Sequence, residues 1–378
     1  MKKQKICIIG NGLTGLTAAL VLSELNIEVH LIGKFKFDEE FFDNRTTAIS
    51  PSNYDFLLKF LDKKDSKLFW PSKKIDLYHE ESNRYFNFMN FENNGKNLMY
   101  IVRNSKLIKT ILKKIKNQKK IKIVNAEVKR IDEKKSKIFL KNKIINYDSI
   151  FLCSGRKSRL VKELVGGRIV SDDLSDIAFT SIIKHNLNII NSKQYFLKEG
   201  PLAILPLNKK EFSLVWSVSK NYKLDIMEDL IKEKLKKTLG LDKKINLSKI
   251  DFFPISFKFN TNFFKKNILV LGEGSYNIHP IAGQGYNLIL RDIKILRVEI
   301  TKHLSCGMQL KDSGVLNNFA VKRKPENFLF GLGISLMSGF FKYNKIAQPI
   351  KNVILKDINK FKFLKNFSIN LSNKGFSH

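Results

Sequence analysis

The sequence predicts an α/β protein with a Rossmann-type nucleotide-binding domain, an interleaved β-sheet domain and helices at the C-terminus. Three observations lead to this fold class. Near the N-terminus, a short apolar run leads through a glycine-rich turn into a helical stretch and a second apolar run. Strand-like alternation fills most of residues 177–255. An apolar run then returns at ILVLGEG, residues 268–274, before a second glycine-rich loop and a long helical pattern. Apolar runs that alternate with helices indicate a parallel sheet, whereas consecutive strand signals indicate a separate sheet.

The N-terminal unit has the βαβ pattern of a dinucleotide-binding fold. KICII at 5–9 is an expected strand, GNGLTG occupies 10–15, a helical stretch reaches Leu25, and IEVHLIG at 27–33 is the next expected strand. In such a turn, glycines permit a sharp bend, close approach of the backbone to a pyrophosphate, and packing of the helix on the strand. The phosphate lies at the positive end of the helix. We therefore expect this turn to bind a cofactor phosphate through Gly10, Gly12, Leu13, Thr14 and Gly15.

One part of the dinucleotide pattern is missing. An acidic residue about 20 positions further on, at the end of the second strand, ordinarily hydrogen-bonds the ribose. At that place the chain reads Leu31-Ile32-Gly33-Lys34. The nearest carboxylates along the chain, and therefore the available substitutes, are Asp38, Glu39 and Glu40.

The remaining chain alternates between two expected domains. Helical patterns cover 55–61, 106–115, 225–239, 286–303 and the region from Leu316 on, and strand patterns cover 75–91, 121–128, 137–140 and 147–155. The hairpin pattern at 75–91 indicates that the chain leaves the first domain and later returns to it. We expect a nucleotide-binding domain of 1–70, 101–174 and 266–310, a second domain of 71–100 and 175–265, and a C-terminal helical region of 311–378.

The second glycine-rich loop carries the more specific signal. It reads GEGSYNIHPIAGQGYNLILRD at 272–292. Pro280 stiffens this loop, Gly283 and Gly285 let the backbone approach a flat ring, and the helix that follows directs its N-terminal amides at the same place. The stretch resembles the flavin-contacting motif of the ubiquinone-biosynthesis hydroxylases, within the para-hydroxybenzoate-hydroxylase-like flavin monooxygenases. Three further segments are similar to that family, namely DNRTTAIS at 43–50, GPLAILPL at 200–207 with SLVW at 213–216, and KRKPEN at 322–327.

The resemblance implies a cofactor, a substrate and a set of site residues. The implied cofactor is FAD, the reductant is NAD(P)H, and the reaction is hydroxylation of the aromatic ring of a polyprenylated phenol. Besides the first glycine-rich turn, the implied cofactor-binding residues are Arg45, Arg103, Glu273, Pro280, Gly283, Gln284, Gly285, Tyr286 and Asn287. The implied substrate-binding residues are Leu205, Pro206 and Trp216. The candidate catalytic residue His279 orients the phenol or shapes the loop, and we favour the structural role. For Arg103, solvent exposure and cofactor contact are equally expected, because exposure is the default state of arginine.

The chain also departs from the family, and two alternative functions stay open. An Asp-Gly pair is usual in the family's middle motif, but CSGRKS at 153–158 places Ser154 at the position of the acid. One alternative is a flavin oxidoreductase of the same fold without oxygen insertion, of the polyprenyl reductase type. The other is a non-catalytic FAD-binding scaffold in a ubiquinone-synthesis complex, which the missing acids would suit.

Composition narrows the class of partner. Lys and Arg number 68 against 35 Asp and Glu, a net charge of +33, but the lysines are spread along the whole chain. Such a balance fits nucleic acid, an anionic membrane surface or neither. Because the sequence carries no zinc-finger or aromatic RNA-binding signature, we expect no nucleic-acid partner. Cys7, Cys153 and Cys306 lack metal-ligand spacing, so we expect reduced thiols and no metal site.

The location follows from the N-terminus and from the implied substrate. The N-terminus runs directly into the first strand, so we expect no signal peptide and a cytoplasmic protein. Because a polyprenylated phenol stays in the bilayer, the protein docks on the inner membrane or receives substrate from a carrier. A C-terminal segment combines apolar and basic residues, as interfacial segments do, and is shorter than the roughly 20 residues of a spanning helix. Its apolar members are Phe328, Leu329, Phe330, Leu332, Ile334, Leu336, Met337, Phe340 and Phe341, and its flanking bases are Lys322, Arg323, Lys324, Lys342 and Lys345. Packing of these apolar side chains in the core is the competing expectation.

Overall fold

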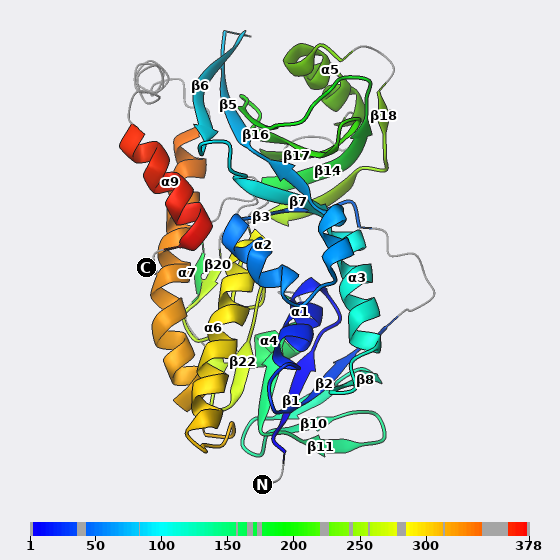
Figure 1. The fold of residues 1–378 in the computed structure, drawn as a ribbon, viewed down its shortest axis with the longest axis vertical. Helices are drawn as coiled ribbons and strands as arrows, with labels where there is room; N and C mark the ends of the chain where they lie inside the picture. The colour runs from blue at the N-terminus through cyan, green and yellow to red at the C-terminus, as the bar shows by residue number, and fades with distance from the viewer. Residues whose placement is uncertain are drawn as a thin grey trace.

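Two large sheets divide the molecule into a lower and an upper half (Figure 1). The computed structural model describes residues 3–35, 43–82, 84–155, 158–164, 169–171, 176–219, 227–241, 245–255, 258–277, 285–312, 314–341 and 362–375. The lower half contains a largely parallel sheet, the upper half a largely antiparallel one, and the C-terminal helices run along one edge. This arrangement confirms the predicted fold class.

A six-stranded sheet forms the centre of the lower half, in the order β21-β22-β12-β1-β2-β8. Its strands are β1 (Lys5–Ile9), β2 (Glu28–Gly33), β8 (Ile121–Asn125), β12 (Ser149–Leu152), β21 (Phe264–Lys265) and β22 (Ile268–Val270). Strands β22, β12, β1, β2 and β8 run parallel, and β21 is antiparallel to β22. The central strands are almost wholly apolar and buried, as parallel strands are when both faces are covered.

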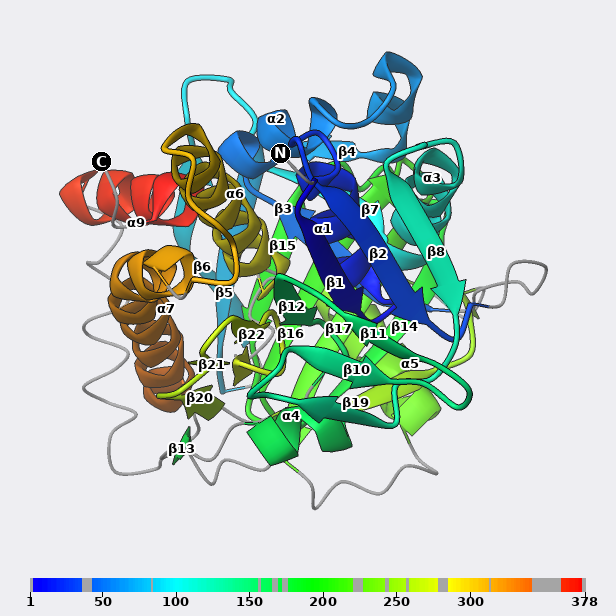
Figure 2. The same cartoon turned by 90° about the horizontal axis from the view of Figure 1, so that it is seen from below.

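Helices cover one face of this sheet and a small sheet covers the other (Figure 2). The helices are α1 (Leu13–Leu22), α3 (Asn104–Lys116) and α6 (Gly285–Ser305), and the small sheet consists of β9 (Arg130–Asp132), β10 (Lys137–Phe139) and β11 (Ile144–Asn146). Helix α3 buries Leu107, Ile111 and Ile115, which are four residues apart and therefore share one face of the helix. Its lysines remain on the opposite face.

The upper half is an eight-stranded sheet with one helix packed against it. The sheet order is β18-β14-β17-β16-β15-β5-β6, and β19 pairs with β14. The strands are β5 (Lys74–Glu81), β6 (Arg84–Glu92), β14 (Asp176–Lys184), β15 (Ser192–Phe196), β16 (Pro201–Asn208), β17 (Glu211–Ser219), β18 (Asn246–Leu247) and β19 (Asp251–Ile255). Helix α5 (Met227–Leu239) packs Ile231 and Leu235 against Phe212 and Trp216 of β17. These side chains form the core of the upper half.

A three-stranded sheet that the sequence patterns did not predict lies between the two halves. Its order is β3-β7-β4, with β3 (Thr46–Ile49), β4 (Trp70–Ser72) and β7 (Met99–Arg103). Ala48 and Ile101 of this sheet pack against Leu205 of β16. Each strand is only three to five residues long, too short for alternation to be recognised. The division of the chain into domains stays a prediction, because this sheet contacts both halves.

Short elements complete the described structure. They are α2 (Pro51–Leu58), the 3-10 helix η1 (Lys63–Leu68), α4 (Arg159–Leu164), and a sheet of β13 (Ile169–Ser171), β20 (Lys258–Asn260) and β23 (Tyr276–Asn277). Helix α2 corresponds to the helical pattern at 55–61, but it begins at Pro51 because proline suits the first turn of a helix. Helix α1 ends at Leu22, three residues before the predicted end at Leu25.

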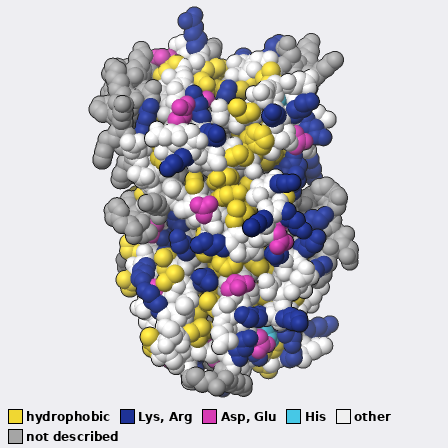
Figure 3. Space-filling view, in the orientation of Figure 1, with side chains coloured by type: hydrophobic (Ala, Val, Ile, Leu, Met, Phe, Trp, Pro, Cys, Tyr) yellow, Lys and Arg dark blue, Asp and Glu magenta, His cyan; other side chains and the backbone are white. Residues whose placement is uncertain are grey.

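The described part of the C-terminal region is mainly helical, as predicted. Helix α7 (Gly314–Phe341) includes Pro325 and packs along α6, and α9 (Lys362–Lys374) lies against α2. Among the described residues, no helix has the length and apolar character needed to cross a membrane. On the face shown in Figure 3, Lys and Arg side chains are scattered with Asp and Glu among them, and hydrophobic side chains gather along the middle. The positive charge is therefore distributed over this face rather than concentrated in one patch.

Candidate functional site

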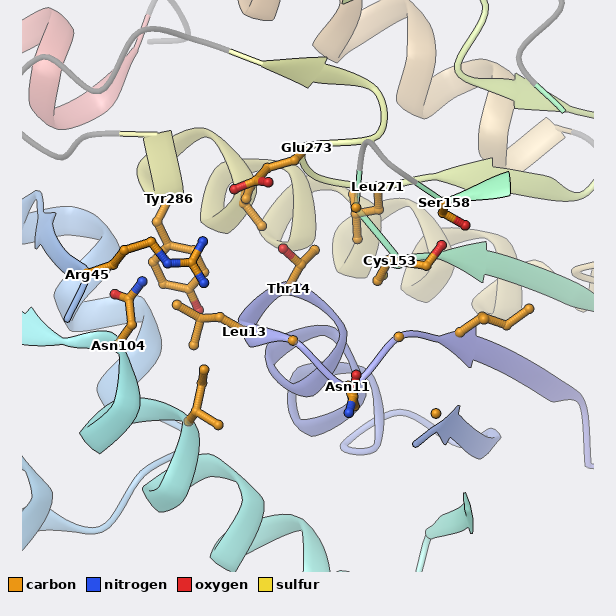
Figure 4. A pocket seen from close by; sticks show the side chains of 18 of the residues that line it. Asn11, Leu13, Thr14, Arg45, Asn104, Cys153, Ser158, Leu271, Glu273 and Tyr286 are labelled. Carbon is orange, nitrogen blue, oxygen red and sulfur yellow. The ribbon is translucent and has the colours of Figure 1, made fainter. Parts of the chain in front are cut away.

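A large cavity opens where β1 ends and α1 begins. Its volume is about 890 Å³, and its walls come from both halves of the molecule. Eight of the predicted cofactor-binding residues line it: Gly10, Gly12, Leu13, Thr14, Arg45, Glu273, Gly285 and Tyr286. Figure 4 shows Arg45 and Asn104 on one side of the start of α1 and Ser158 on the other. The cavity is therefore extended, with the first glycine-rich turn near its centre.

The first glycine-rich turn is shaped by three different constraints. Gly10 has a φ of +131°, and a Cβ there would lie 2.4 Å from the carbonyl oxygen of Cys153. A Cβ on Gly15 would lie 2.0 Å from the carbonyl oxygen of Gly10. A Cβ on Gly12 would meet nothing within 4 Å and would project into open space. Gly10 and Gly15 therefore allow the turn to fold, whereas Gly12 keeps the cavity clear.

The start of α1 offers backbone amides to this open space. Gly12 is its N-cap residue, no side chain caps the helix, and its first turn holds no acidic residue. The first amides of a helix lack intrahelical partners and carry partial positive charge, so they bind anions. The charged residues on the cavity wall are four cations and two carboxylates: Lys34, Arg45, Lys129, Arg159, Glu127 and Glu273. This balance suits a ligand with negative charge.

The two glycine-rich motifs meet at α1, although they are distant in sequence. A Cβ on Gly272, whose φ is +82°, would lie 2.9 Å from the side chain of Thr14. The hydroxyl groups of Tyr286 and Thr17 are 2.5 Å apart in a buried hydrogen bond that ties α6 to α1. Burial raises the pKa of Tyr286, so its phenol stays protonated at neutral pH. The start of α6 is thus held beside the start of α1.

Arg45 lies at the boundary between the two halves. Its guanidinium donates to both oxygens of Asp43, at 2.8 to 3.1 Å, and its Cζ lies 5.0 Å from the ring centre of Phe253 on β19. Burial lowers the pKa of Arg45, but the hydrogen bonds and negative charge of Asp43, together with the charge of Glu273, outweigh that effect and raise it. The guanidinium is therefore a fixed positive charge on the cavity wall.

Two hydroxyl groups on the cavity wall lack hydrogen-bond partners within the described residues. They are Oγ1 of Thr46 on β3 and Oγ of Ser154, which follows β12. A buried polar group without a partner costs about 1–3 kcal/mol. Ser154 occupies the position where the family usually has an acid, so a neutral donor replaces a charge there. Both hydroxyls would be satisfied by a polar ligand that extends along the cavity.

The upper half contributes an apolar wall that sequence reasoning missed. The residues are Ala178 and Thr180 of β14, Val215 of β17, and Phe253, Pro254 and Ile255 of β19. Because side chains alternate along a strand, Val215 faces the cavity while Trp216 faces the opposite side. Strand periodicity places Val215 and Trp216 on opposite faces of the sheet, but it does not show which face meets the cavity.

Six predicted site residues lie away from the cavity wall: Gly15, Arg103, Leu205, Pro206, Trp216 and Asn287. Trp216 is fully buried in the core of the upper half and its indole N–H donates to the carbonyl oxygen of Gly200 at 3.2 Å. Leu205 and Pro206 lie on β16, where Leu205 packs under β3 and β7. Trp216 is thus enclosed in the core of the upper half and Leu205 lies against β3 and β7, and the expected substrate contacts of the three residues stay predictions. Gly15 lies behind the turn, in contact with Gly10.

The side chains of Arg103 and Asn287 bond to other protein groups and do not line the cavity. Nη2 of Arg103 lies 3.2 Å from Oε2 of Glu211, and the next residue, Asn104, lines the cavity in its place. The side chain of Asn287 accepts from the backbone amide of Ser50 at 2.9 Å and donates to the carbonyl oxygen of Ala48 at 2.9 Å. It therefore joins α6 to β3 and α2.

The loop between β23 and α6 lies outside the described residues. It contains four predicted site residues: His279, Pro280, Gly283 and Gln284. The proposed ribose substitutes Asp38, Glu39 and Glu40 also lie outside them. Their roles stay predictions. Within the described residues, no group of His, Cys, Asp or Glu side chains is arranged to hold a metal ion.

Comparisons with known proteins agree with this fold. Residues 4–186 match the family described as pyridine nucleotide-disulphide oxidoreductase, and residues 217–371 match the family described as squalene epoxidase. Among solved structures, p-nitrophenol 4-monooxygenase PnpA from Pseudomonas putida has a TM-score of 0.82 at 12% identity, with 100% of this chain and 99% of that chain covered. HpxO from Klebsiella pneumoniae, solved with FAD and uric acid, has a TM-score of 0.75 at 12% identity, covering 98% and 97%.

Curated relatives are named for ubiquinone biosynthesis. The mitochondrial ubiquinone biosynthesis monooxygenase COQ6 of Dictyostelium discoideum is 27% identical over 215 residues, which are 47% of this chain and 43% of that protein. The 3-demethoxyubiquinol 3-hydroxylase of Escherichia coli K12 is 27% identical over 158 residues, 40% of each chain. These two matches thus span about two fifths of each relative. The ubiquinone hydroxylase UbiM of Neisseria meningitidis is 22% identical over 386 residues, covering 95% of this chain and 82% of that protein.

The fold is shared with solved proteins that include a monooxygenase and a protein that binds FAD. The relatives by sequence include ubiquinone-biosynthesis hydroxylases, and the resemblance stated from the motifs is confirmed.

Proposed function

We propose that this chain is an FAD-dependent monooxygenase that hydroxylates the aromatic ring of a polyprenylated phenol in ubiquinone biosynthesis. The observation that carries the proposal is one extended cavity that joins both glycine-rich motifs to an apolar wall of the upper half. The names of the relatives support ubiquinone biosynthesis as the pathway. NAD(P)H is the proposed reductant.

The described residues fit FAD along the length of the cavity. The turn at Gly12 and the first amides of α1 would hold the pyrophosphate. The unpaired hydroxyls of Thr46 and Ser154 would each find a polar partner along the same ligand. Arg45 and the start of α6 at Tyr286 would border the flavin part. Reduced FAD supplies the chemistry of oxygen activation, in which one oxygen atom enters the ring and the other leaves as water.

The protein itself contributes the shape of the cavity and the exclusion of water from it. The walls provided by Val215, Phe253 and Ile255 are apolar and would exclude water from the ring of the phenol. Arg45 provides a fixed positive charge at the border between the cofactor half and this wall. His279 stays the proposed orienting residue for the phenol. The proposal assigns no acid–base role to any of the described residues.

A labelled-oxygen experiment tests the proposed reaction. The purified protein would be given NAD(P)H, ¹⁸O₂ and a prenylated phenol of short chain. Substrate-dependent NAD(P)H oxidation with one ¹⁸O in the product supports the monooxygenase. Reduction without label would establish the flavin oxidoreductase instead, and bound FAD without turnover would establish the scaffold. Quinone profiling in a strain that lacks the gene would then identify the step from the precursor that accumulates.

We further propose that the protein works at the membrane surface, alone or with other proteins of ubiquinone synthesis. Helix α7 exposes Val321, Leu329 and Leu332, with 76%, 49% and 38% of their side-chain surface accessible. Three members of the expected docking segment are instead internal. Phe330 is buried, Phe328 packs against Phe259 at 5.4 Å between ring centres, and Arg323 is buried against Asp292. Among the members whose side chains the structure describes, the proposed contact therefore uses the outward ones. The other expected members lie outside the described side chains, and their roles stay predictions: Ile334, Leu336, Met337, Phe340, Phe341, Lys342 and Lys345.

A further inference from the structure

Asn11 crowds the position that usually carries the ribose-binding acid. Gly33 ends β2, and a Cβ built on it would lie 3.0 Å from Cβ of Asn11 and 3.3 Å from the backbone nitrogen of Asn11. The side chain of Asn11 is held there because its Nδ2 donates to the carbonyl oxygen of Lys34 at 2.5 Å. A side chain at position 33 would therefore need Asn11 to shift by a few tenths of an ångström. Glycine at this position avoids that crowding.

A different strand brings a carboxylate to the same end of the cavity. Gly33 pairs with Asn125 at the end of β8, and the amide of Ala126 donates to the carbonyl oxygen of Gly33 at 3.1 Å. The side chain of Asn125 accepts from the amide of Phe35 at 3.0 Å and donates to its carbonyl oxygen at 3.3 Å. These bonds fix the chain after β8 beside the end of β2. The next residue, Glu127, lines the cavity.

Glu127 is held as a charged acceptor. Its Oε2 lies 2.9 Å from Nζ of Lys34 and 3.4 Å from Nζ of Lys129, and both lysines line the cavity as well. The hydrogen bonds from Lys34 and Lys129 lower the pKa of Glu127. About half of the side chain remains accessible. A carboxylate has about four acceptor sites, so two lysine contacts leave room for hydroxyl donors from a ligand.

We propose that Glu127, carried by the end of β8, is the residue that hydrogen-bonds the ribose hydroxyls of the cofactor's adenosine half, in place of the acid at the end of β2. This inference rests on the proposed binding of FAD. It assigns to one described residue the role for which the sequence offered Asp38, Glu39 and Glu40. Asn11 and Asn125 are positioning residues, because they fix the two chain segments and do not themselves bind the ribose.

A purely electrostatic role for Glu127 and a ribose-binding role predict opposite changes in FAD affinity when Glu127 is removed. If Glu127 only neutralised Lys34 and Lys129, its removal would raise the net charge of this part of the cavity wall by one. FAD would then bind more tightly, and the effect would fade at high salt. If Glu127 binds the ribose, its removal deletes hydrogen bonds to a charged group and FAD binds more weakly. The direction of the change in affinity therefore separates the two roles.

The test compares ligands that contain or lack the adenosine half. Apoprotein of the wild type, Glu127→Ala, Glu127→Gln and the control Glu133→Gln would be titrated with FAD, FMN and ADP, with binding followed by flavin fluorescence or calorimetry. Glu133 pairs with Lys265 and is not among the residues of the cavity wall. We expect Glu127→Ala to weaken FAD and ADP binding about ten- to a hundredfold and to leave FMN binding unchanged. Glu127→Gln, which keeps one acceptor oxygen, should lie between Glu127→Ala and the wild type.

The outcomes separate this inference from the proposed function. Unchanged or tighter FAD binding in Glu127→Ala would overturn the ribose role while FAD binding itself stands. Equal weakening of FAD and FMN would also overturn it, because a structural defect does not distinguish the two ligands. If the folded wild type bound neither FAD nor FMN, the proposed function would fail and the inference with it.

Discussion

At the scale of single residues, glycines that look alike in the sequence have different tasks. Gly12 and Gly15 belong to the same turn, but only Gly12 faces open space. Gly15 is in contact with the backbone of Gly10, which leaves no room for a methyl group. The first glycine therefore concerns binding, and the second concerns folding.

Substitutions at these two glycines should separate binding from stability. Gly12→Val should fold normally and lose flavin binding, because its side chain fills the space that the pyrophosphate would occupy. Gly15→Ala should lower the free energy of unfolding by about 1–3 kcal/mol, the usual cost of overpacking. Urea unfolding of the apoproteins and titration with FAD measure the two effects. The interpretation fails if Gly12→Val binds FAD as the wild type does.

A second residue-scale prediction concerns His30, which is buried inside the lower half. Its Nδ1 lies 2.8 Å from the hydroxyl of Tyr147, and its Nε2 lies 2.6 Å from Oε1 of Glu28. Burial lowers the pKa of His30, although Glu28 acts in the other direction. Below its ordinary value of 6.5 and down to the folded pKa, the unfolded chain binds more protons than the folded chain. Stability must therefore fall as the pH falls through this window.

Thermal unfolding at several pH values would measure this effect. The wild type should lose stability as the pH falls below about 6.5, and His30→Gln should show a flatter dependence in that range because it does not titrate. The hydrogen bond to His30 lowers the pKa of Glu28, so the pair loses further stability at lower pH. An identical pH dependence in wild type and His30→Gln would show that another group is responsible.

At the scale of elements, α6 and α7 are joined by a buried charge cluster. Nε of Arg323 donates to Oδ1 of Asp292 at 2.6 Å, and both side chains are 2% accessible. The phenol of Tyr276 donates to Oδ2 of Asp292 at 2.6 Å, and Nδ2 of Asn327 donates to Oδ1 at 3.0 Å. The charge pair is thus surrounded by further hydrogen bonds, which is the condition under which a buried ion pair is tolerated.

Breaking the buried pair of Asp292 and Arg323 should lower the free energy of unfolding much more than breaking an exposed ion pair. We expect Asp292→Ala to lower the free energy of unfolding by about 3–5 kcal/mol, because it leaves the charge of Arg323 buried and unpaired. Asp292→Asn should cost less, since the amide oxygen still accepts a hydrogen bond. Lys237→Ala, which removes an exposed pair with Glu233 on α5, is the matched control and should change little. Urea denaturation of the three variants gives the comparison, and equal losses would contradict the expected burial effect.

The sequence predicted the elements that have long periodic patterns better than it predicted the directions of individual side chains. The spacing of Leu107, Ile111 and Ile115 predicts α3 directly, and the two glycine-rich motifs predict residues of the cavity wall. The strand that contains Val215 and Trp216 was predicted, but not the face that meets the cavity, because that depends on β3 and β7. Glu127 could not be found either, since its position depends on parallel pairing of β2 with β8.

At the scale of the whole molecule, the net charge of +33 is spread widely, and the apolar face of α7 lies on the outside. Distributed positive charge attracts an anionic surface weakly at many points, and exposed leucines add apolar contact. Both effects contribute to the proposed docking, since Lys and Arg are scattered over the face shown in Figure 3 and no helix among the described residues is long and apolar enough to cross a membrane.

Sedimentation with anionic vesicles tests this proposal. The wild type should co-sediment at low salt and less so at high salt, because salt screens the charge contribution. Leu329→Ser combined with Leu332→Ser should weaken binding at both salt concentrations, as should serine at Phe340 and Phe341. Ile144→Ser, at an exposed position on β11, is the control and should bind as the wild type does. Failure of the wild type to co-sediment at low salt would count against membrane docking.

The flavin content of the purified protein tests the central claim most directly. The two glycine-rich motifs, which meet where Thr14 contacts Gly272, should together hold one FAD. We expect a yellow protein with flavin absorbance that releases unmodified FAD on denaturation, in close to equimolar amount. A colourless preparation that is well folded and cannot be reconstituted with FAD would contradict the account.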